Sequence, residues 1–145
     1  MRFIQINDNW NAEPNSPDVE IKVQNNDVIV SFYLNAFEFS EYAEGDKGIV
    51  TFYNCIQYRY GSPNDEGFYC FGQSRYKEFG VKWGEFYEIE DSDWRTNFPD
   101  AILLRNEIDS SKKYKHYLFY FKDGAFECIA NSYSLNILRQ PDDFE

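Results

Sequence analysis

Residues 19–32, VEIKVQNNDVIVSF, alternate apolar and polar side chains on both sides of a central Asn25-Asn26 pair. Such alternation on both sides of a short polar turn is typical of a β-hairpin with one buried face, and asparagine tolerates the positive φ angles that a two-residue turn requires. The predicted cross-strand pairs are Val23 with Val28, Ile21 with Val30, and Val19 with Phe32. Because a slip of one residue would turn these side chains to the other face, the pattern also specifies the register.

A second hairpin is predicted at residues 116–131, HYLFYFKDGAFECIAN, where Asp123-Gly124 is a favoured turn dipeptide. This turn pairs Phe121 with Phe126, Phe119 with Cys128, and Tyr117 with Ala130 on one apolar face. On the opposite face it pairs Tyr120 with Glu127, Leu118 with Ile129, and His116 with Asn131. The opposite face is mixed in polarity, so we expect it either to be partly covered or to offer a binding surface.

Further strands are predicted from aromatic and β-branched runs at residues 2–6, 48–60, 67–71, 83–90 and 101–105. Residues 74–80 allow one short helical turn ending at Gly80, and residues 131–140 are compatible with a strand or a helix. No repeat or linker divides the chain, so we expect a single domain over residues 1–145. The sequence therefore predicts a mainly β fold, an antiparallel β-sandwich or a strongly curved sheet built from hairpins, with at most one or two short helices.

The composition supports strands and restricts the kind of partner. Phe, Tyr and Trp make up 20% of the residues, and aromatic side chains favour strands. The 25 acidic residues outnumber the 14 Lys and Arg, which gives a formal net charge of -11. Negative charge repels phosphates and so disfavours nucleic-acid binding. The charge either serves solubility alone or speeds the encounter with a basic macromolecule.

The three cysteines, Cys55, Cys70 and Cys128, are odd in number and show no CxxC spacing. We therefore expect buried reduced thiols and no disulfide framework or structural zinc site. The first ten residues, MRFIQINDNW, reach Asp8 without a long apolar core, so they do not resemble a signal peptide. No apolar run approaches membrane-spanning length. These features predict a cytoplasmic protein that does not enter a membrane.

No residue pattern specifies a reaction. His116 is the only histidine, it lies among lysines in KKYKHYLF, and no nucleophile motif is close to it in the sequence, so we expect a surface histidine on a strand. A calcium loop starting at Asp8 fails because its third and fifth positions are Trp10 and Ala12. Glycine-rich phosphate loops are absent from the sequence. We expect no catalytic residue, no metal and no cofactor.

Acidic segments rich in aromatic residues are the strongest signal of a binding surface. Residues 83–94, WGEFYEIEDSDW, supply the candidates Trp83, Glu85, Glu88, Glu90, Asp91, Asp93 and Trp94. Residues 37–46 add Glu38, Glu41, Glu44 and Asp46, and the predicted loop tip at 61–67 adds Asp65 and Glu66. Carboxylates steer a basic partner and aromatic side chains anchor it. The alternative interpretation of residues 83–94 is a solvated edge strand whose charges prevent aggregation.

In size, acidity, aromatic β character and lack of catalytic apparatus, the chain resembles the small acidic immunity proteins that bacteria keep against contact-dependent or polymorphic toxins. The resemblance implies a non-enzymatic protein that binds a toxin domain, often a basic nuclease, and blocks its active site or substrate surface. Two other functions stay open. One is a β-sandwich protein that binds a small ligand or carbohydrate with Trp10, Trp83 and Trp94 as stacking platforms. The other is a hydrolase that uses two carboxylates across a cleft.

Overall fold

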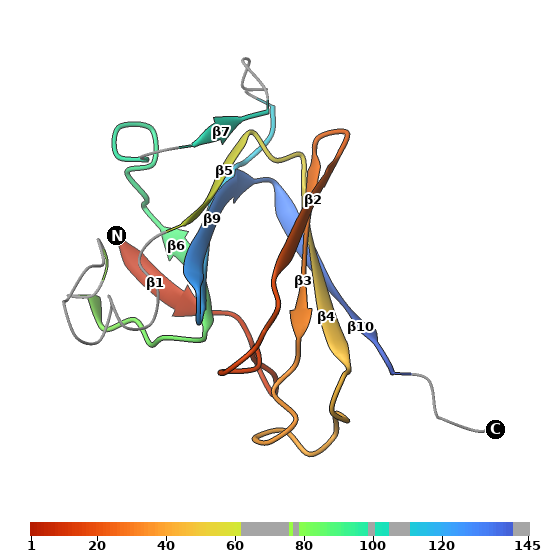
Figure 1. Ribbon diagram of the computed structural model, residues 1–145. Coiled ribbons are helices and arrows are strands. Elements are labelled where there is room, and N and C mark those ends of the chain that lie inside the picture. Colours follow the sequence, from red (N-terminus) through yellow and green to blue (C-terminus); the bar gives the residue numbers. More distant parts are fainter. Residues whose placement is uncertain (62–75, 77–78, 99–100, 105–110, 141–145) are drawn as a thin grey trace.

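The computed structural model describes residues 1–61, 76, 79–98, 101–104 and 111–140 (Figure 1). These residues form ten strands: β1 (Arg2–Gln5), β2 (Glu20–Gln24), β3 (Asp27–Tyr33), β4 (Lys47–Tyr53), β5 (Gln57–Gly61), β6 (Phe86–Glu90), β7 (Ile102–Leu103), β8 (Lys115–Phe121), β9 (Gly124–Ala130) and β10 (Ser132–Leu138). The strands build two antiparallel sheets that pack together without closing into a barrel, which confirms the predicted fold class. The strand predicted at 67–71 and the residues Asp65, Glu66 and Cys70 lie outside the described residues.

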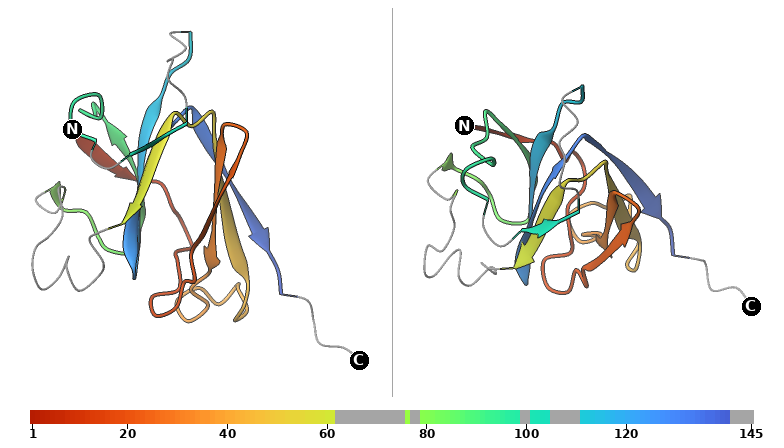
Figure 2. Two further views of the ribbon diagram at one scale, coloured as in Figure 1. Left: turned by 45° about the horizontal axis from the view of Figure 1, so that its top comes forward. Right: turned by 90° about the horizontal axis from the view of Figure 1, so that it is seen from above.

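The larger sheet has six strands in the order β1-β6-β8-β9-β5-β7, and the smaller sheet has four in the order β10-β4-β3-β2. The chain changes sheets between β1 and β2, between β4 and β5, and between β9 and β10, and the last two connections lie side by side at the top of Figure 1. Backbone hydrogen bonds join these two connections, from Ile56 to Ile129 and from Asn131 to Tyr53, each 2.9 Å long. Figure 2 shows the two sheets from two further directions, with the chain crossing between them at this end.

The hairpin predicted at residues 19–32 has the predicted register. β2 and β3 pair Ile21 with Val30 and Val23 with Val28. The turn falls at Asn25-Asn26, and Asn25 adopts the left-handed φ angle, 58°, that a short turn needs. Alternate residues of β3 are fully buried and the residues between them are half-buried. The apolar side chains of the alternating pattern in β3 therefore face the core.

The hairpin predicted at residues 116–131 exists, but its predicted register is wrong by two residues. β8 and β9 pair Phe121 with Gly124, Phe119 with Phe126, and Tyr117 with Cys128. Lys122-Asp123 forms the turn, and Gly124 belongs to the strand. A Cβ at Gly124 would lie 3.0 Å from the carbonyl oxygen of Gly61, so the close approach of β5 requires glycine there. A shift of two residues leaves every side chain on its predicted face.

The prediction of one strand over residues 48–60 is wrong because the chain changes sheets inside this range. β4 ends at Tyr53, Asn54 adopts a left-handed φ of 52°, and β5 begins in the other sheet. The segment at 131–140, predicted as a strand or a helix, contains strand β10. β1, β6 and β7 fall within their predicted ranges. In the part of the chain that the structure describes, no helix has the length and apolarity needed to cross a membrane.

Aromatic rings fill the space between the sheets. Phe32 of the smaller sheet packs against Phe119 of the larger, with ring centroids 5.1 Å apart. Phe52 packs in the same way against Phe126 at 5.3 Å. Gly48 lies opposite Phe32 on β4 and leaves room for the ring, since a Cβ there would lie 2.8 Å from it. Contacts of this kind between rings stabilise a core beyond simple burial.

The segment after β1 closes the lower end of the sandwich in Figure 1. Trp10 is 6% exposed, and its ring centroid lies 5.8 Å from those of Phe32 and Phe119, one in each sheet. Ala12 forms an antiparallel bridge with Leu34, just beyond β3. The indole is therefore part of the core and is not open to a ligand, so Trp10 does not serve as a stacking platform.

The outer face of the larger sheet is covered as well. Leu118 and Tyr120 of β8 are each 1% exposed and pack with Tyr76 and Val81. Of the turn predicted at residues 74–80, the described part includes a hydrogen bond from the Phe79 N–H to the Tyr76 carbonyl (3.0 Å). The second hairpin was expected to have its mixed face either partly covered or open as a binding surface. The face is covered, since every residue of β8 and β9 except Lys115 is buried.

Replacing Phe119 by alanine should lower the free energy of unfolding by about 3–5 kcal/mol, because a fully buried ring between the two sheets is lost. Phe37→Ala is the matched control. Its side chain is 84% exposed, so the same substitution should change stability by less than about 0.5 kcal/mol. Urea denaturation followed by tryptophan fluorescence measures both values. Equal losses in the two variants would contradict this packing.

Candidate functional site

The acidic segment 83–94 is not a solvated edge strand. Its centre forms β6, which lies between β1 and β8, and Phe86, Tyr87 and Ile89 are buried. The segment also does not present a single binding face. Trp83 and Glu85 line a hollow at the start of β6, whereas Glu88, Glu90, Asp91 and Trp94 line a different hollow toward its end.

At the end of β6 most of the predicted acids have partners within the protein. The pairs are Glu88 with Lys115 (3.6 Å), Glu90 with Arg2, and Asp93 with Asn97 (2.9 Å). Asp91 is exposed, and its left-handed φ of 54° turns the chain out of the strand. A carboxylate already paired with a cation attracts a second cation less strongly. This half of the segment is therefore the weaker place to attract a basic protein.

At the start of β6, buried amides hold two carboxylates together. Asn11 donates hydrogen bonds from its amide to Glu85 (3.1 Å) and to Glu38 of the β3–β4 loop (3.3 Å). Asn7 also donates to Glu85, and Asn35 to Glu38 (3.3 Å). All three asparagines are 7% exposed. These contacts join the N-terminal segment, the β3–β4 loop and β6, and they place two carboxylates in one hollow, the feature that the hydrolase alternative requires.

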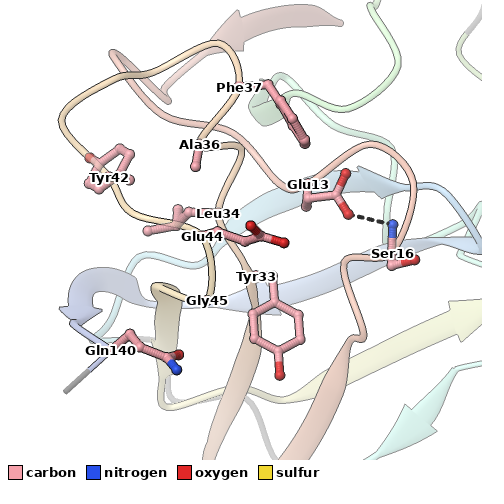
Figure 3. Close-up of a pocket in the computed structure, with 10 residues that line it drawn as sticks. All are labelled: Glu13, Ser16, Tyr33, Leu34, Ala36, Phe37, Tyr42, Glu44, Gly45 and Gln140. Carbon is pink, nitrogen blue, oxygen red and sulfur yellow. Dashed lines mark hydrogen bonds between the residues drawn. The ribbon is translucent and has the colours of Figure 1, made fainter. Parts of the chain in front are cut away.

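The β3–β4 loop, residues 35–46, lies at the lower end of Figure 1 and carries an exposed phenylalanine. Phe37 is 84% exposed, more than any other large hydrophobic side chain that the structure describes. It lines a hollow of about 540 Å³ whose other walls include Tyr33, Glu13 and Glu44. Figure 3 draws the carboxylates of Glu13 and Glu44 between the rings of Phe37 and Tyr33.

We call the surface formed by Glu13, Phe37, Glu38, Glu41, Glu44 and Glu85 the acidic end. The acidic end contains two hollows, and Glu13 lines both of them. One is the hollow of about 540 Å³ beside Phe37, and the other, of about 390 Å³, is lined by Glu38 and Glu85. Within the described residues, none of these five carboxylates forms an ion pair with Lys or Arg. Lys122 also lines the smaller hollow, but its ammonium lies too far from these carboxylates to form an ion pair. The acidic end thus combines unpaired negative charge with an exposed ring.

Asp46 anchors the end of the β3–β4 loop. Its buried carboxylate accepts hydrogen bonds from the N–H groups of Gln140 (2.7 Å) and Ala43 (2.9 Å) and from the Arg139 guanidinium (3.0 Å). The Gln140 N–H has the largest effect on the pKa of Asp46. With the Ala43 and Arg139 contacts it outweighs burial, which raises the pKa, and holds it below the ordinary value of 3.8. Asp46 therefore fixes the loop and is not presented to a partner.

The expectation that His116 is a surface residue is wrong. Its side chain is fully buried on the outer face of the larger sheet, beside the ring of Phe98 at 5.4 Å. Its Nε2 lies 2.8 Å from a carboxylate oxygen of Glu127, and its Nδ1 lies 2.5 Å from the hydroxyl of Ser92. Ser92 is 24 residues away in the sequence, so no local motif reveals the contact.

Glu127 is the centre of this buried polar cluster. It lies opposite Arg59 of β5 and pairs with it at 3.2 Å, and it accepts a hydrogen bond from the Tyr76 hydroxyl at 3.0 Å. Glu127 is 2% exposed and Arg59 9%. A carboxylate this deeply buried is tolerated only when charges and donors surround it. Strand alternation places Arg59 and Glu127 on the face away from the main core, but it does not reveal that this face is covered.

The remaining sequence candidates are dispersed. Trp83 stacks on Tyr120 with ring centroids 4.6 Å apart, and Trp94 lies under the guanidinium of Arg95 at 4.5 Å. Cys55 and Cys128 are free and buried, as expected, and burial raises the pKa of the Cys128 thiol. Among the described residues, no group of three or more His, Cys, Asp or Glu is placed to hold a metal ion. Asp65 and Glu66 lie outside the described residues.

Comparisons of this chain with protein-family models, with curated proteins and with solved structures find no match. Support for a function therefore lies in the charge, exposure and hydrogen bonding of the chain's own residues.

Asp46→Asn should destabilise the protein by about 1–3 kcal/mol at neutral pH, because a carboxylate with three donors is replaced by an amide. The folded-state pKa of Asp46 is lowered, so its stabilising contribution is present above pH 3.8 and is lost as the pH falls through the folded-state value. The difference between wild type and variant should therefore shrink below pH 3.8. Urea denaturation across this range checks it. The exposed Asp123→Asn is the control, and a difference that grows in acid would refute the assignment.

Glu127→Gln should destabilise the protein by about 3–5 kcal/mol, because the buried Arg59 guanidinium then faces a neutral group. Glu90→Gln removes an exposed ion pair with Arg2 and should cost less than about 1 kcal/mol. Thermal and urea unfolding compare the two variants. Similar small losses in both would show that the cluster around Glu127 is not the buried network found here.

Proposed function

We propose that this protein binds a basic protein through the acidic end. The observation that carries the proposal is Phe37, a phenylalanine 84% exposed and set among carboxylates that have no ion-pair partner in the described residues. A phenylalanine ring that stays in water contributes none of the favourable free energy that burial of its apolar surface would supply. A partner that covers it recovers this free energy, and aromatic anchors of this kind dominate many interfaces.

The charge of the chain supports the sign of the partner. The net charge is -11, and an overall opposite charge accelerates encounter over several ångströms before contact. At the acidic end, Glu41 and Glu44 are exposed on the same loop as Phe37. A basic surface that docks here would meet long-range attraction first and the phenylalanine anchor second.

The loop that carries these residues is fixed in the free protein. Its end is anchored by Asp46, and Glu38 within it is held by the amides of Asn11 and Asn35. A surface that is already ordered loses little conformational entropy when a partner binds. This preorganisation favours a stable, specific complex over a transient encounter.

For the partner we propose a basic nuclease-type toxin domain, the class that the resemblance to immunity proteins implies. A nuclease binds the phosphates of its substrate with positive charge. An array of carboxylates that occupies this basic surface would compete with nucleic acid, so binding alone would neutralise the toxin without any reaction. The role that we propose for the acidic end is therefore inhibition by binding alone, in the cytoplasm of the cell that makes the protein.

The test is complex formation with a nuclease-type toxin domain encoded beside the gene of this protein, measured by calorimetry at low and at physiological ionic strength. Phe37→Ala should weaken binding at least about tenfold, as expected for loss of an aromatic anchor. Glu41→Gln with Glu44→Gln should weaken binding at low ionic strength and flatten the salt dependence of the affinity, because the double variant removes steering charge.

The matched control is Glu90→Gln with Asp91→Asn, which removes the same number of charges from the far end of β6. It should leave the affinity within about twofold of wild type, since general charge is reduced equally but the acidic end is intact. Absence of any complex at low ionic strength would refute the proposed partner. A control double variant that weakens binding as much as the loop variants would place the interface elsewhere.

A further inference from the structure

The hollow toward the end of β6, of about 680 Å³, contains a hydroxyl that is hydrogen-bonded to the buried histidine. Its walls include Ser92, His116, Trp94, Lys113 and Lys115. Ser92 is half-buried in this wall, while the His116 side chain behind it is fully enclosed. The left-handed turn at Asp91 directs the chain back over β8, which brings Ser92 to His116.

The hydrogen bonds around Glu127 indicate which nitrogen of the neutral His116 ring carries the proton. Glu127 receives the Arg59 guanidinium at 3.2 Å and the Tyr76 hydroxyl at 3.0 Å, which stabilises it as a carboxylate. A carboxylate only accepts, so Nε2 of His116 carries the hydrogen of the 2.8 Å contact. In the neutral ring, Nδ1 then has a free lone pair. With its only proton on Nε2, the ring accepts at Nδ1, so the Ser92 hydroxyl donates across the 2.5 Å contact while its Oγ accepts the Trp94 N–H at 3.1 Å.

We propose that Ser92 is a nucleophile activated by His116 and Glu127, and that this hollow hydrolyses small polar esters. The order of groups, hydroxyl to imidazole to carboxylate, is that of a serine hydrolase triad, with the two ring nitrogens exchanged. The base lies within hydrogen-bond distance of the hydroxyl, and the carboxylate beyond it stabilises the imidazolium that forms. This activity uses none of the residues of the acidic end.

The reaction balances with water as the second substrate. Ser92 Oγ attacks the ester carbonyl carbon while its proton passes to His116 Nδ1, and a tetrahedral intermediate forms. The intermediate collapses, the bond to the alkoxy group breaks, and His116 returns the proton to the departing alcohol. Water then attacks the acyl-serine, gives a proton to His116, and the acid leaves as Ser92 regains its hydrogen. The net change is ester and water to acid and alcohol.

The walls of the hollow indicate the class of substrate. Apart from Ile89 and Trp94, the lining side chains are polar or charged, which favours a small polar ester over a long apolar one. Lys115 is paired with Glu88, whereas Lys113 forms no ion pair within the described residues. An ammonium in this wall stabilises negative charge that develops on the carbonyl oxygen.

A fluorophosphonate probe tests the nucleophile directly, because a serine Oγ displaces its fluoride and keeps the phosphonyl group. Intact mass and peptide mapping should show one adduct, on Ser92, and Ser92→Ala should show none. With p-nitrophenyl acetate, Ser92→Ala should hydrolyse at least about a hundredfold more slowly. Ser134→Ala is the matched control, since it removes a half-buried hydroxyl that is hydrogen-bonded to Tyr53 on the other sheet.

Ser92→Cys guards against a structural explanation, because a thiol is nearly isosteric and remains a nucleophile. It should lose the fluorophosphonate adduct, keep the thermal unfolding midpoint, and be acylated by p-nitrophenyl acetate at the introduced sulfur. Absence of an adduct on wild-type Ser92 would overturn the proposal. So would hydrolysis by Ser92→Ala at the wild-type rate, which would leave Ser92 as a turn-forming residue that satisfies a buried histidine.

Discussion

The packing of Phe32 onto Phe119, sealed by Trp10, is the contact on which the rest of the molecule depends. These three rings join the smaller sheet, the larger sheet and the N-terminal segment within 6 Å of one another. With the sheets fixed in this way, β3 ends and β4 begins at a defined place, and the loop between them projects from it (Figure 1). The acidic end thus depends on core packing, because the loop that carries Phe37 starts and finishes on two strands of the packed smaller sheet.

Buried polar side chains hold the loops and the outer face of the larger sheet, which the aromatic core does not reach. The amides of Asn7, Asn11 and Asn35 join loops at one end of β6, while Glu127 joins Arg59 and His116 under the outer face of the larger sheet. Buried polar groups are tolerated where such partners form hydrogen bonds with them. The two ends of β6 consequently differ in character. One end presents an exposed phenylalanine among carboxylates that form no ion pair with the described Lys and Arg residues, and the other encloses a histidine behind a serine.

Much of the fold is predictable from period-two alternation alone. The first hairpin had its register specified by alternation and by Asn25-Asn26, and the faces of the second hairpin were right even though its turn was not. The turn was wrong because Gly124 is required by the approach of β5, a contact between distant segments. The break at Asn54 was missed for a similar reason: the residues on both sides favour strands, and only the sandwich decides that they belong to different sheets.

By itself, the sequence determined that the chain is mainly β, which faces of its hairpins are apolar, and that its charge is strongly negative, because these depend on local pattern and composition. Tertiary structure decided which acids remain available. In the folded protein Glu88 forms an ion pair with Lys115 and Glu90 with Arg2, and Asp46 is buried. Glu41 and Glu44 remain exposed on the loop that carries Phe37. Tertiary structure also brought Ser92, His116 and Glu127 together from separate segments. Pairing and burial depend on which strands become neighbours, and that order is a property of the folded sheets, not of any local stretch.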